Sequence, residues 1–87
     1  MPWHYVYMVR CADGTLYTGY ATDTTARIDA HNDGRGAKYT RSRRPVALVY
    51  RQRFAAKGRA LSREYALKQL TRDQKERLIA IRSKRTR

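Results

Sequence analysis

Cysteine and acidic residues are scarce in this 87-residue sequence, and long apolar runs are absent from it. The single cysteine, Cys11, excludes an internal disulfide bond, and no His or Cys stands at metal-ligand spacing beside it, which argues against a zinc site. No apolar run approaches the length that crosses a membrane, and no apolar signal region opens the chain. We therefore expect a cytoplasmic protein with no membrane partner.

The excess of positive charge is the strongest compositional feature. Twenty Lys and Arg residues stand against seven Asp and Glu residues, which gives a net charge of +13, and fifteen of the basic residues are Arg. This exceeds the net charge of roughly 2–8 that solubility requires in a small domain. Because the planar guanidinium group suits phosphate, the expected partner is a nucleic acid. A basic surface that serves solubility alone is the competing interpretation.

Aromatic and β-branched runs, turn signals and capping residues predict one small α+β domain. The expected order is β-β-α-β-α-α, with a three-stranded antiparallel or mixed sheet flanked by helices. Strands are expected at residues 4–11, 16–21 and 47–54, and helices at residues 23–32, 59–70 and 71–82, the first capped by Asp23 and the last by a Thr71/Gln74 capping box. Lys57-Gly58 is expected to form a turn. Residues 1–82 would form the domain and residues 83–87 a frayed basic tail.

The link between the first two strands determines which side chains share a face of the sheet. A two-residue loop would pair Tyr7 with Tyr20 and turn Tyr17 to the opposite face. A three-residue loop that ends at a left-handed Gly14 would instead pair Val9 with Tyr17 and leave Tyr7 on the same face. Chemistry that involves both phenols, Tyr7 and Tyr17, therefore predicts the three-residue loop.

Glu64 is one of two glutamates in the chain and falls on the inward face of its expected helix. Three of its four neighbours one turn away are apolar: Ala60, Leu61 and Leu67, with Lys68 the fourth. Carboxylates are seldom buried unless they are paired or bound to a metal. A metal site and a salt bridge, with Lys68 or with an arginine of another element, are both open interpretations.

Four further residues carry groups that suit phosphoryl chemistry. Arg27 and His31 are four apart on the first expected helix and share a face. An arginine can stabilise the developing charge of a phosphoryl group, and a histidine can move a proton or orient the phosphate. The phenols of Tyr7 and Tyr17 have a free pKa of about 10, so a cation or metal must lower it before they accept a proton. Each of these residues also has a purely structural interpretation.

Two backbone features complete the candidate site. Gly19 inside a strand indicates the close approach of a backbone or ligand. Residues 34–44 form an expected basic loop with one aromatic, which suits phosphate tracking and base stacking. The nucleic-acid-binding candidates in it are Arg35, Lys38, Tyr39, Arg41, Arg43 and Arg44. A solvated loop is the alternative.

Together these motifs resemble the GIY-YIG nuclease superfamily, over nearly the whole chain from Tyr5 to about Leu78. Tyr5-Val6-Tyr7 stands where the family has GIY, and Tyr17-Thr18-Gly19 stands where it has YIG. The first glycine of GIY is therefore replaced by a tyrosine here. The likeness is greatest to small stand-alone bacterial members, which carry a Gly-Arg-Gly-Ala-Lys-Tyr-Thr run like residues 34–40.

Three single residues also match the family pattern. Arg27 falls at the family's helix arginine, His31 at a histidine of many members, and Glu64 at the metal-binding glutamate. Some family enzymes use an asparagine after the glutamate helix, but the one asparagine of this chain is Asn32. Family nucleases usually carry a second DNA-binding domain as well, and a protein partner that supplies specificity would take its place.

The resemblance implies hydrolysis of a phosphodiester bond with one Mg²⁺ or Mn²⁺. Glu64 would be the sole protein carboxylate on the metal, and Arg27 would hold the non-bridging oxygens. Tyr7 or Tyr17, with help from His31, would orient or deprotonate the attacking water. We expect a structure-selective or weakly specific DNA endonuclease in repair or recombination. A basic DNA- or RNA-binding module of the same fold without turnover is the alternative, and a structural protein of a ribonucleoprotein particle is a third.

Overall fold

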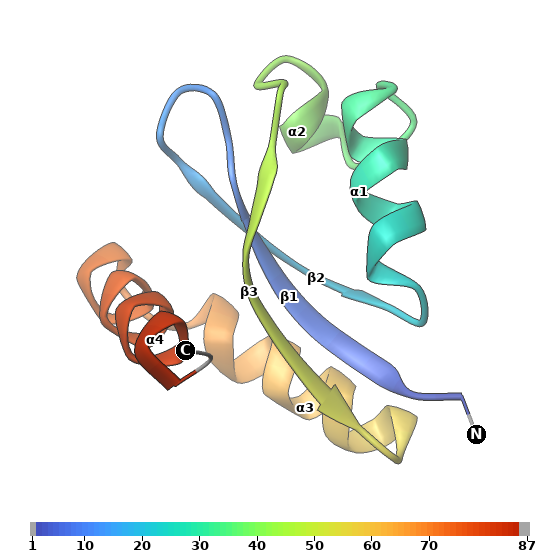
Figure 1. Ribbon diagram of the computed structural model, residues 1–87, viewed down its shortest axis with the longest axis vertical. Coiled ribbons are helices and arrows are strands. Elements are labelled where there is room, and N and C mark those ends of the chain that lie inside the picture. Colours follow the sequence, from blue (N-terminus) through green and yellow to red (C-terminus); the bar gives the residue numbers. More distant parts are fainter. Residues whose placement is uncertain (1, 86–87) are drawn as a thin grey trace.

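A hairpin and one further strand build the sheet on which the helices pack (Figure 1). The structure is a computed structural model that describes residues 2–85. Its elements are β1 (His4–Arg10), β2 (Leu16–Ala21), α1 (Thr24–Asn32), α2 (Lys38–Arg41), β3 (Ala47–Phe54), α3 (Lys57–Lys68) and α4 (Arg72–Arg85). The sheet has the order β2-β1-β3, and both pairings are antiparallel. The expected α+β class is therefore confirmed, with an antiparallel sheet.

The hairpin between β1 and β2 has the three-residue loop. Gly14 adopts a left-handed conformation with φ of 86°, and its N–H donates to the Cys11 carbonyl at 2.9 Å. Val9 is paired with Tyr17, and Tyr7 with Gly19. The predicted register is thus confirmed, and the two tyrosines lie on the same face of the sheet.

Strand β1 is the centre of the protein, since both of its faces are covered. Its residues Val6 to Val9 are all at most 1% exposed. Val6 and Met8 pack with residues of α3 and α4, and Tyr7 and Val9 occupy the core on the α1 side. Figure 1 shows this division, with α1 and α2 on one side of the strands and α3 and α4 on the other. Because successive side chains of β1 point to opposite faces of the sheet, this strand contributes to both hydrophobic cores.

The helix ends follow the local sequence closely. Asp23 accepts the Ala26 N–H at 3.0 Å and caps α1. Thr71 and Gln74 form both bonds of a capping box before α4, at 2.9 and 3.2 Å. These side chains satisfy backbone donors that the first turn leaves unpaired. Both predicted caps are confirmed.

Three boundaries differ from expectation. The four-residue helix α2 lies inside the expected loop 34–44, because a single turn leaves no periodic pattern to detect. Helix α3 spans Lys57–Lys68 instead of residues 59–70, so Lys57-Gly58 opens a helix and the predicted turn is wrong. Helix α4 continues through Arg85, which makes residues 83–85 helical, while the last two residues of the expected tail lie outside the described residues. Within residues 2–85 no helix has the length and apolar character needed to cross a membrane.

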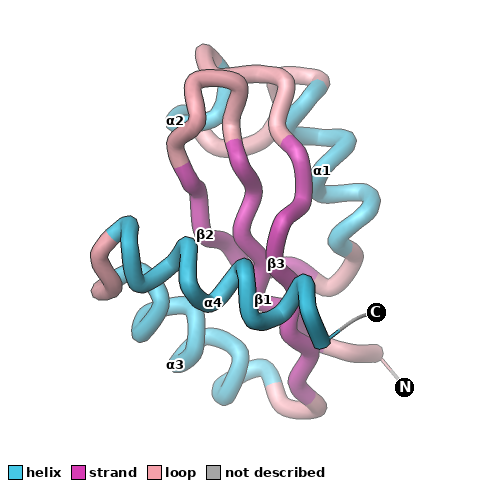
Figure 2. Tube along the Cα trace, turned by 60° about the vertical axis from the view of Figure 1, so that its left-hand side comes forward, coloured by secondary structure: helices cyan, strands magenta, loops and turns pink. Residues whose placement is uncertain are grey.

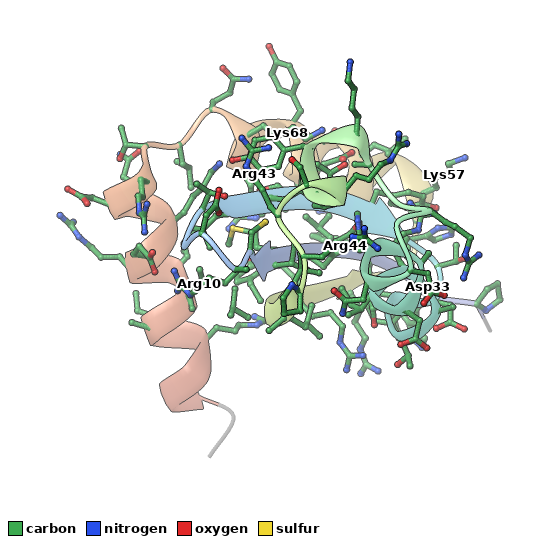
Figure 3. All side chains as sticks on the ribbon, turned by 90° about the horizontal axis from the view of Figure 1, so that it is seen from above. Arg10, Asp33, Arg43, Arg44, Lys57 and Lys68 are labelled. Atoms are coloured by element: carbon green, nitrogen blue, oxygen red, sulfur yellow. The ribbon has the colours of Figure 1, made fainter. Side chains whose placement is uncertain are left out.

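Helix α4 runs across the strands of the sheet (Figure 2). Arginine side chains fasten this helix to the sheet. Arg10, at the end of β1, donates two hydrogen bonds to the Glu76 carboxylate, both at 2.7 Å, and Figure 3 shows Arg10 beside this helix. These bonds hold the pKa of Glu76 below its usual range. Arg82 donates from Nε and Nη2 to the Arg51 carbonyl on β3, at 3.1 and 2.9 Å. Glu76 therefore anchors α4 through an ion pair that is still partly exposed to solvent.

Among the described side chains, one buried polar group in the core has no hydrogen-bond partner. The Thr18 hydroxyl is buried and makes no hydrogen bond to the described residues. Thr18→Val keeps the shape of the side chain and removes this hydroxyl, so we expect the free energy of unfolding to rise by about 1 kcal/mol. Thr40 is also buried, but its hydroxyl is bonded, so Thr40→Val should lower stability. Urea unfolding of both variants measures the signs, and a loss of stability in Thr18→Val would contradict the argument.

Candidate active site

The ring of Tyr7 lies against the backbone of Gly19. A Cβ atom at Gly19 would come within 2.5 Å of the Tyr7 hydroxyl oxygen and 2.6 Å of its Cζ. Any side chain at this position would therefore displace the phenol. A close approach does occur at Gly19, but the predicted backbone or ligand is wrong, because the approaching group is the Tyr7 side chain.

A chain of three hydrogen bonds runs inward from the Tyr7 hydroxyl. Tyr7 Oη and His31 Nε2 are 2.8 Å apart, and His31 Nδ1 and Thr40 Oγ1 are 2.8 Å apart. Thr40 Oγ1 donates to the Ala37 carbonyl at 3.0 Å. Because Thr40 gives its one proton to this carbonyl, it accepts from His31 Nδ1, and His31 Nε2 accepts from Tyr7. The bonding pattern therefore assigns a neutral imidazole with its proton on Nδ1.

Burial keeps these groups uncharged. It raises the pKa of Tyr7 to about 12, with additions from the Tyr17 phenol and the Glu64 carboxylate, while the Arg27 guanidinium opposes the rise. Burial also lowers the pKa of His31, and Arg27 lowers it further. At neutral pH Tyr7 is protonated and His31 is neutral, as the hydrogen bonds require. Arg27 therefore does not bring the Tyr7 pKa below its free value.

Glu64 lies on α3, and its carboxylate is near enough to raise the pKa of Tyr7. Its side chain is 19% exposed and accepts from Lys68 Nζ at 3.2 Å, which is one of the two salt bridges that the sequence left open. Of its expected apolar neighbours, Ala60 and Leu67 are buried, whereas Leu61 is 40% exposed. Glu64 thus lies at the border between the core and solvent.

The donor set around Glu64 fits a hydrated divalent ion. No cluster of three or more carboxylate, His or Cys side chains occurs within the described part of the chain, so Glu64 would be a lone carboxylate ligand. Mg²⁺ commonly keeps several waters and uses one or two carboxylates together with substrate phosphates. The residues present are therefore compatible with Mg²⁺ or Mn²⁺, with Lys68 competing for the same carboxylate.

Tyr17 lies beside His31 at the outer side of the site. Its ring meets the His31 ring edge-on, with centroids 5.4 Å apart, and stacks on Tyr39 at 5.9 Å. The Arg43 guanidinium lies 4.0 Å from the centre of the Tyr39 ring. Arg43 also donates to Asp13 and to the Tyr39 carbonyl, at 3.0 and 2.8 Å. Tyr39 is 39% exposed and is part of a packed stack that connects α2 to the hairpin loop.

The other basic candidates of residues 34–44 divide into residues with side-chain hydrogen bonds and residues without them. Arg44 donates to the carbonyls of Arg41 and Asn32, and Arg35 pairs with Asp33 at 2.8 Å. The side chains of Lys38 and Arg41 are exposed and form no hydrogen bond or salt bridge within residues 2–82. Among the basic candidates of this segment, Lys38 and Arg41 on the short helix α2 are therefore the most accessible to a partner.

Thr40 and Gly36 contribute to the site without having been identified in the sequence. Thr40 is fully buried and fixes the His31 ring, and a Cβ atom at Gly36 would collide with His31 Nδ1. The run of residues 34–40, which resembles a run in related proteins, could have pointed to these two residues. Its basic composition favoured a nucleic-acid-binding loop instead. The structure shows that the same run forms the wall behind His31.

The three-stranded antiparallel sheet with helices on both faces defines a small α+β domain of the GIY-YIG type. The GIY-YIG catalytic domain matches residues 3–77, and this chain therefore belongs to the GIY-YIG family. The domain belongs to a nuclease superfamily. The chain is 58% identical over 76 residues to a UPF0213 protein of Staphylococcus aureus strain Mu50, an alignment that covers 87% of this chain and 93% of that protein.

Two solved structures resemble this protein. The UPF0213 protein of Bacillus halodurans, solved by NMR, is 48% identical with a TM-score of 0.60 and covers 91% of this chain and 84% of its own. A protein of E. faecalis, also solved by NMR, is 42% identical with a TM-score of 0.64 and covers 93% of this chain and 86% of its own. The fold and the family are thus shared with small proteins of similar length.

The contact between Tyr7 and Gly19 predicts a strong effect of adding one methyl group. Gly19→Ala should displace the phenol and break its bond to His31, with a cost of about 1–3 kcal/mol for the overpacking. Gly58→Ala is the control, since a Cβ at Gly58 meets no atom within 4 Å, and it should keep or slightly raise stability. Thermal unfolding and the His31 ring signals in NMR spectra measure both effects. Equal stability of the two variants would mean that the Tyr7 ring does not lie over Gly19.

The Thr40 contact predicts the tautomer of His31. In the wild type the ¹⁵N signals of the imidazole should show a protonated Nδ1 and an unprotonated Nε2. Thr40→Val removes the acceptor for Nδ1 and should allow the other tautomer, at a cost of about 1–3 kcal/mol in stability. Thr40→Ser retains the hydroxyl and should preserve the wild-type signals. A wild-type tautomer in Thr40→Val would show that Thr40 does not set it.

Proposed function

We propose that this protein is a metal-dependent endonuclease that hydrolyses phosphodiester bonds of DNA. The observation that carries the proposal is the hydrogen bond between Tyr7 and His31, on which Arg27 of α1 and Glu64 of α3 act with opposite charges. A cation, an anion and a proton acceptor around one hydroxyl suit phosphoryl transfer better than simple packing. Membership of a nuclease superfamily supports the same reaction class.

Tyr7 and His31 would handle the proton of the attacking water. The Tyr7 hydroxyl would accept a proton from the water while donating its own to His31 Nε2, along the observed 2.8 Å bond. This relay removes the need for a phenolate at neutral pH, which a pKa of about 12 disfavours. Tyr17, which is half-buried beside His31, would line the entrance to the site. We therefore favour Tyr7 over Tyr17 as the group that contacts the water.

Arg27 and Glu64 would act on the phosphate. Arg27 is exposed and close to Tyr7, and its guanidinium would hold the non-bridging oxygens. Glu64 would hold a hydrated Mg²⁺ or Mn²⁺. Such an ion, when bound, neutralises the scissile phosphate and the leaving oxygen.

Lys38 and Arg41 would direct the nucleic acid toward this site, with Arg35, Tyr39, Arg43 and Arg44 beside them. The net charge of +13 and the free charges of α2 support an interaction with the DNA backbone. We propose weakly specific or structure-selective cutting in cytoplasmic DNA repair or recombination, with a protein partner supplying further specificity. The Glu64–Lys68 salt bridge favours the second candidate, a DNA- or RNA-binding module without turnover.

The two glutamates of the chain provide a matched test. Glu64→Gln should reduce cleavage by roughly 10²–10³-fold, the loss typical of removing one group that stabilises developing charge. Glu76→Gln carries the same chemical change far from the site and should cleave within about twofold of the wild type. The assay uses labelled duplex, single-stranded, flap and branched DNA with Mg²⁺, Mn²⁺ or EDTA. Binding is measured in parallel and should be little changed by Glu64→Gln.

The outcomes separate the two candidate functions. Cleavage that requires a divalent ion and Glu64 would support the endonuclease. Cleavage that survives in purified Glu64→Gln would exclude the metal assignment. Binding of DNA by both variants, with no cleavage of any substrate, would favour the binding module.

A further inference from the structure

We propose that a second surface, formed by Trp3, Tyr5, Arg51 and Arg53, binds the phosphate backbone of the nucleic-acid strand outside the cleavage site. We call it the aromatic–arginine surface. The inference rests on the proposed function, because the partner is the same nucleic acid. It adds a binding site that lies outside residues 34–44, where the sequence placed the nucleic-acid contacts.

Strand register puts Tyr5, Arg51 and Arg53 on one face of the sheet, and Trp3, which precedes β1, joins them through its contact with Arg53. Tyr5 is paired with Arg53, and Tyr7 with Arg51, across β1 and β3. Paired residues share a face, and so do residues two apart along a strand. The surface therefore lies on the face that carries Tyr7, on the side of the sheet toward α1.

Each arginine of the surface is stacked on an aromatic ring. Arg53 Cζ lies 4.3 Å from the centre of the Trp3 ring, and Arg51 Cζ lies 5.0 Å from that of Tyr5. A guanidinium held over a ring by cation–π attraction loses freedom and keeps its N–H groups as donors. Both arginines are exposed, and Trp3 is 37% exposed. The arrangement thus presents two oriented phosphate donors with little remaining freedom, which lowers the entropic cost of binding.

The charges of this surface are not neutralised by the protein. Arg51 and Arg53 form no salt bridge with any described carboxylate, and the single side-chain bond of the pair runs from Arg51 to Thr24 Oγ1 at 3.3 Å. Asp23, the neighbouring acid at the start of α1, is engaged in capping the helix. By contrast, Arg43 is bonded to Asp13. The aromatic–arginine surface is therefore the better placed to exchange counterions for phosphates.

The spacing suits consecutive phosphates of one strand. Residues two apart on a β-strand are separated by about 6.6 Å, and this is the distance between the backbone positions of Arg51 and Arg53. Adjacent phosphates of an extended nucleic-acid strand are spaced similarly. Thr24, which bonds Arg51, begins the helix that carries Arg27 one turn later, so the surface leads toward the proposed site. A single nucleic-acid strand fits this geometry better than a membrane, because the surface offers two spaced donors and no broad apolar face.

Trp3 is the one tryptophan of the chain, so its fluorescence reports directly on this surface. The protein is titrated in EDTA with a single-stranded oligonucleotide, at several salt concentrations. Each phosphate contact contributes about 0.7 to the slope of log affinity against log salt. Arg51→Gln/Arg53→Gln should lower this slope by about 1.4, and Arg53→Gln alone by about 0.7. Arg53→Gln removes no side-chain hydrogen bond, so this variant is expected to fold. A lower salt slope in it therefore reflects binding and not unfolding.

A charge-matched control separates a local contact from a general effect of charge. Arg59→Gln/Arg77→Gln removes two exposed charges from α3 and α4, the helices on the opposite face of the sheet, and should leave the slope unchanged. In the wild type the Trp3 fluorescence should change and saturate together with binding measured by anisotropy. Vesicles containing an anionic lipid serve as the second probe and should leave Trp3 fluorescence unchanged.

Each outcome bears on the proposal. Three results would overturn the aromatic–arginine surface alone. The first is a wild-type salt slope in Arg51→Gln/Arg53→Gln, and the second is an equal loss of slope in the control variant. The third is Trp3 fluorescence that does not change when the oligonucleotide saturates the protein. A fluorescence response to vesicles in place of the oligonucleotide would assign the surface to a lipid and overturn it as well. If the wild type binds no nucleic acid at low salt, the proposed function fails together with this inference.

Discussion

The pairing of Tyr7 with Gly19 is the contact on which the candidate site depends. A glycine opposite a tyrosine leaves room for the phenol to lie across the neighbouring strand. There its hydroxyl meets His31 of α1, and the charges of Arg27 and Glu64 act on it from two helices. The three-residue hairpin loop sets this pairing, since a shift of one residue would turn the facing side chains of β2 to the other face. The site therefore originates in the geometry of a short turn.

The buried hydrogen bonds behind Tyr7 give the site a defined direction of proton donation. Thr40 can donate only once, and because it donates to a carbonyl, the proton positions on His31 and Tyr7 follow. The low polarity of the interior keeps these groups neutral and makes each bond costly to break. The sequence predicted that residues 34–40 form a loop that binds nucleic acid. Two members of this segment, Gly36 and Thr40, instead pack against His31 and fix its ring. The exposed Lys38 and Arg41 remain free to act on a partner.

The arginines of this chain have different roles according to what surrounds them. Arg10 and Arg82 fasten α4 through hydrogen bonds, and Arg43 joins the hairpin loop to α2. Arg51 and Arg53 lie on aromatic rings and have no carboxylate partner within the described residues. Composition alone treats all fifteen arginines as one basic surface. Their separation into structural and free groups matters, because only the unpaired charges can release counterions on binding a nucleic acid.

The sequence by itself determined the class of fold, the three strands and the caps at Asp23 and Thr71, and it narrowed the hairpin to two registers. These features depend on local chemistry, such as alternation along strands, a left-handed glycine and side chains that satisfy free N–H groups. The candidate residues Tyr7, Arg27, His31 and Glu64 came from a family resemblance, since the spacing of residues alone left structural interpretations open.

Tertiary structure alone decided the rest. It brought Thr40 and Gly36 against His31, joined Glu76 to Arg10 across 66 residues, and set Arg53 on Trp3. It also raised the pKa of Tyr7 to about 12, although a cation stands nearby. Contacts between distant segments and the extent of burial arise only when the chain is packed, and no local pattern records them.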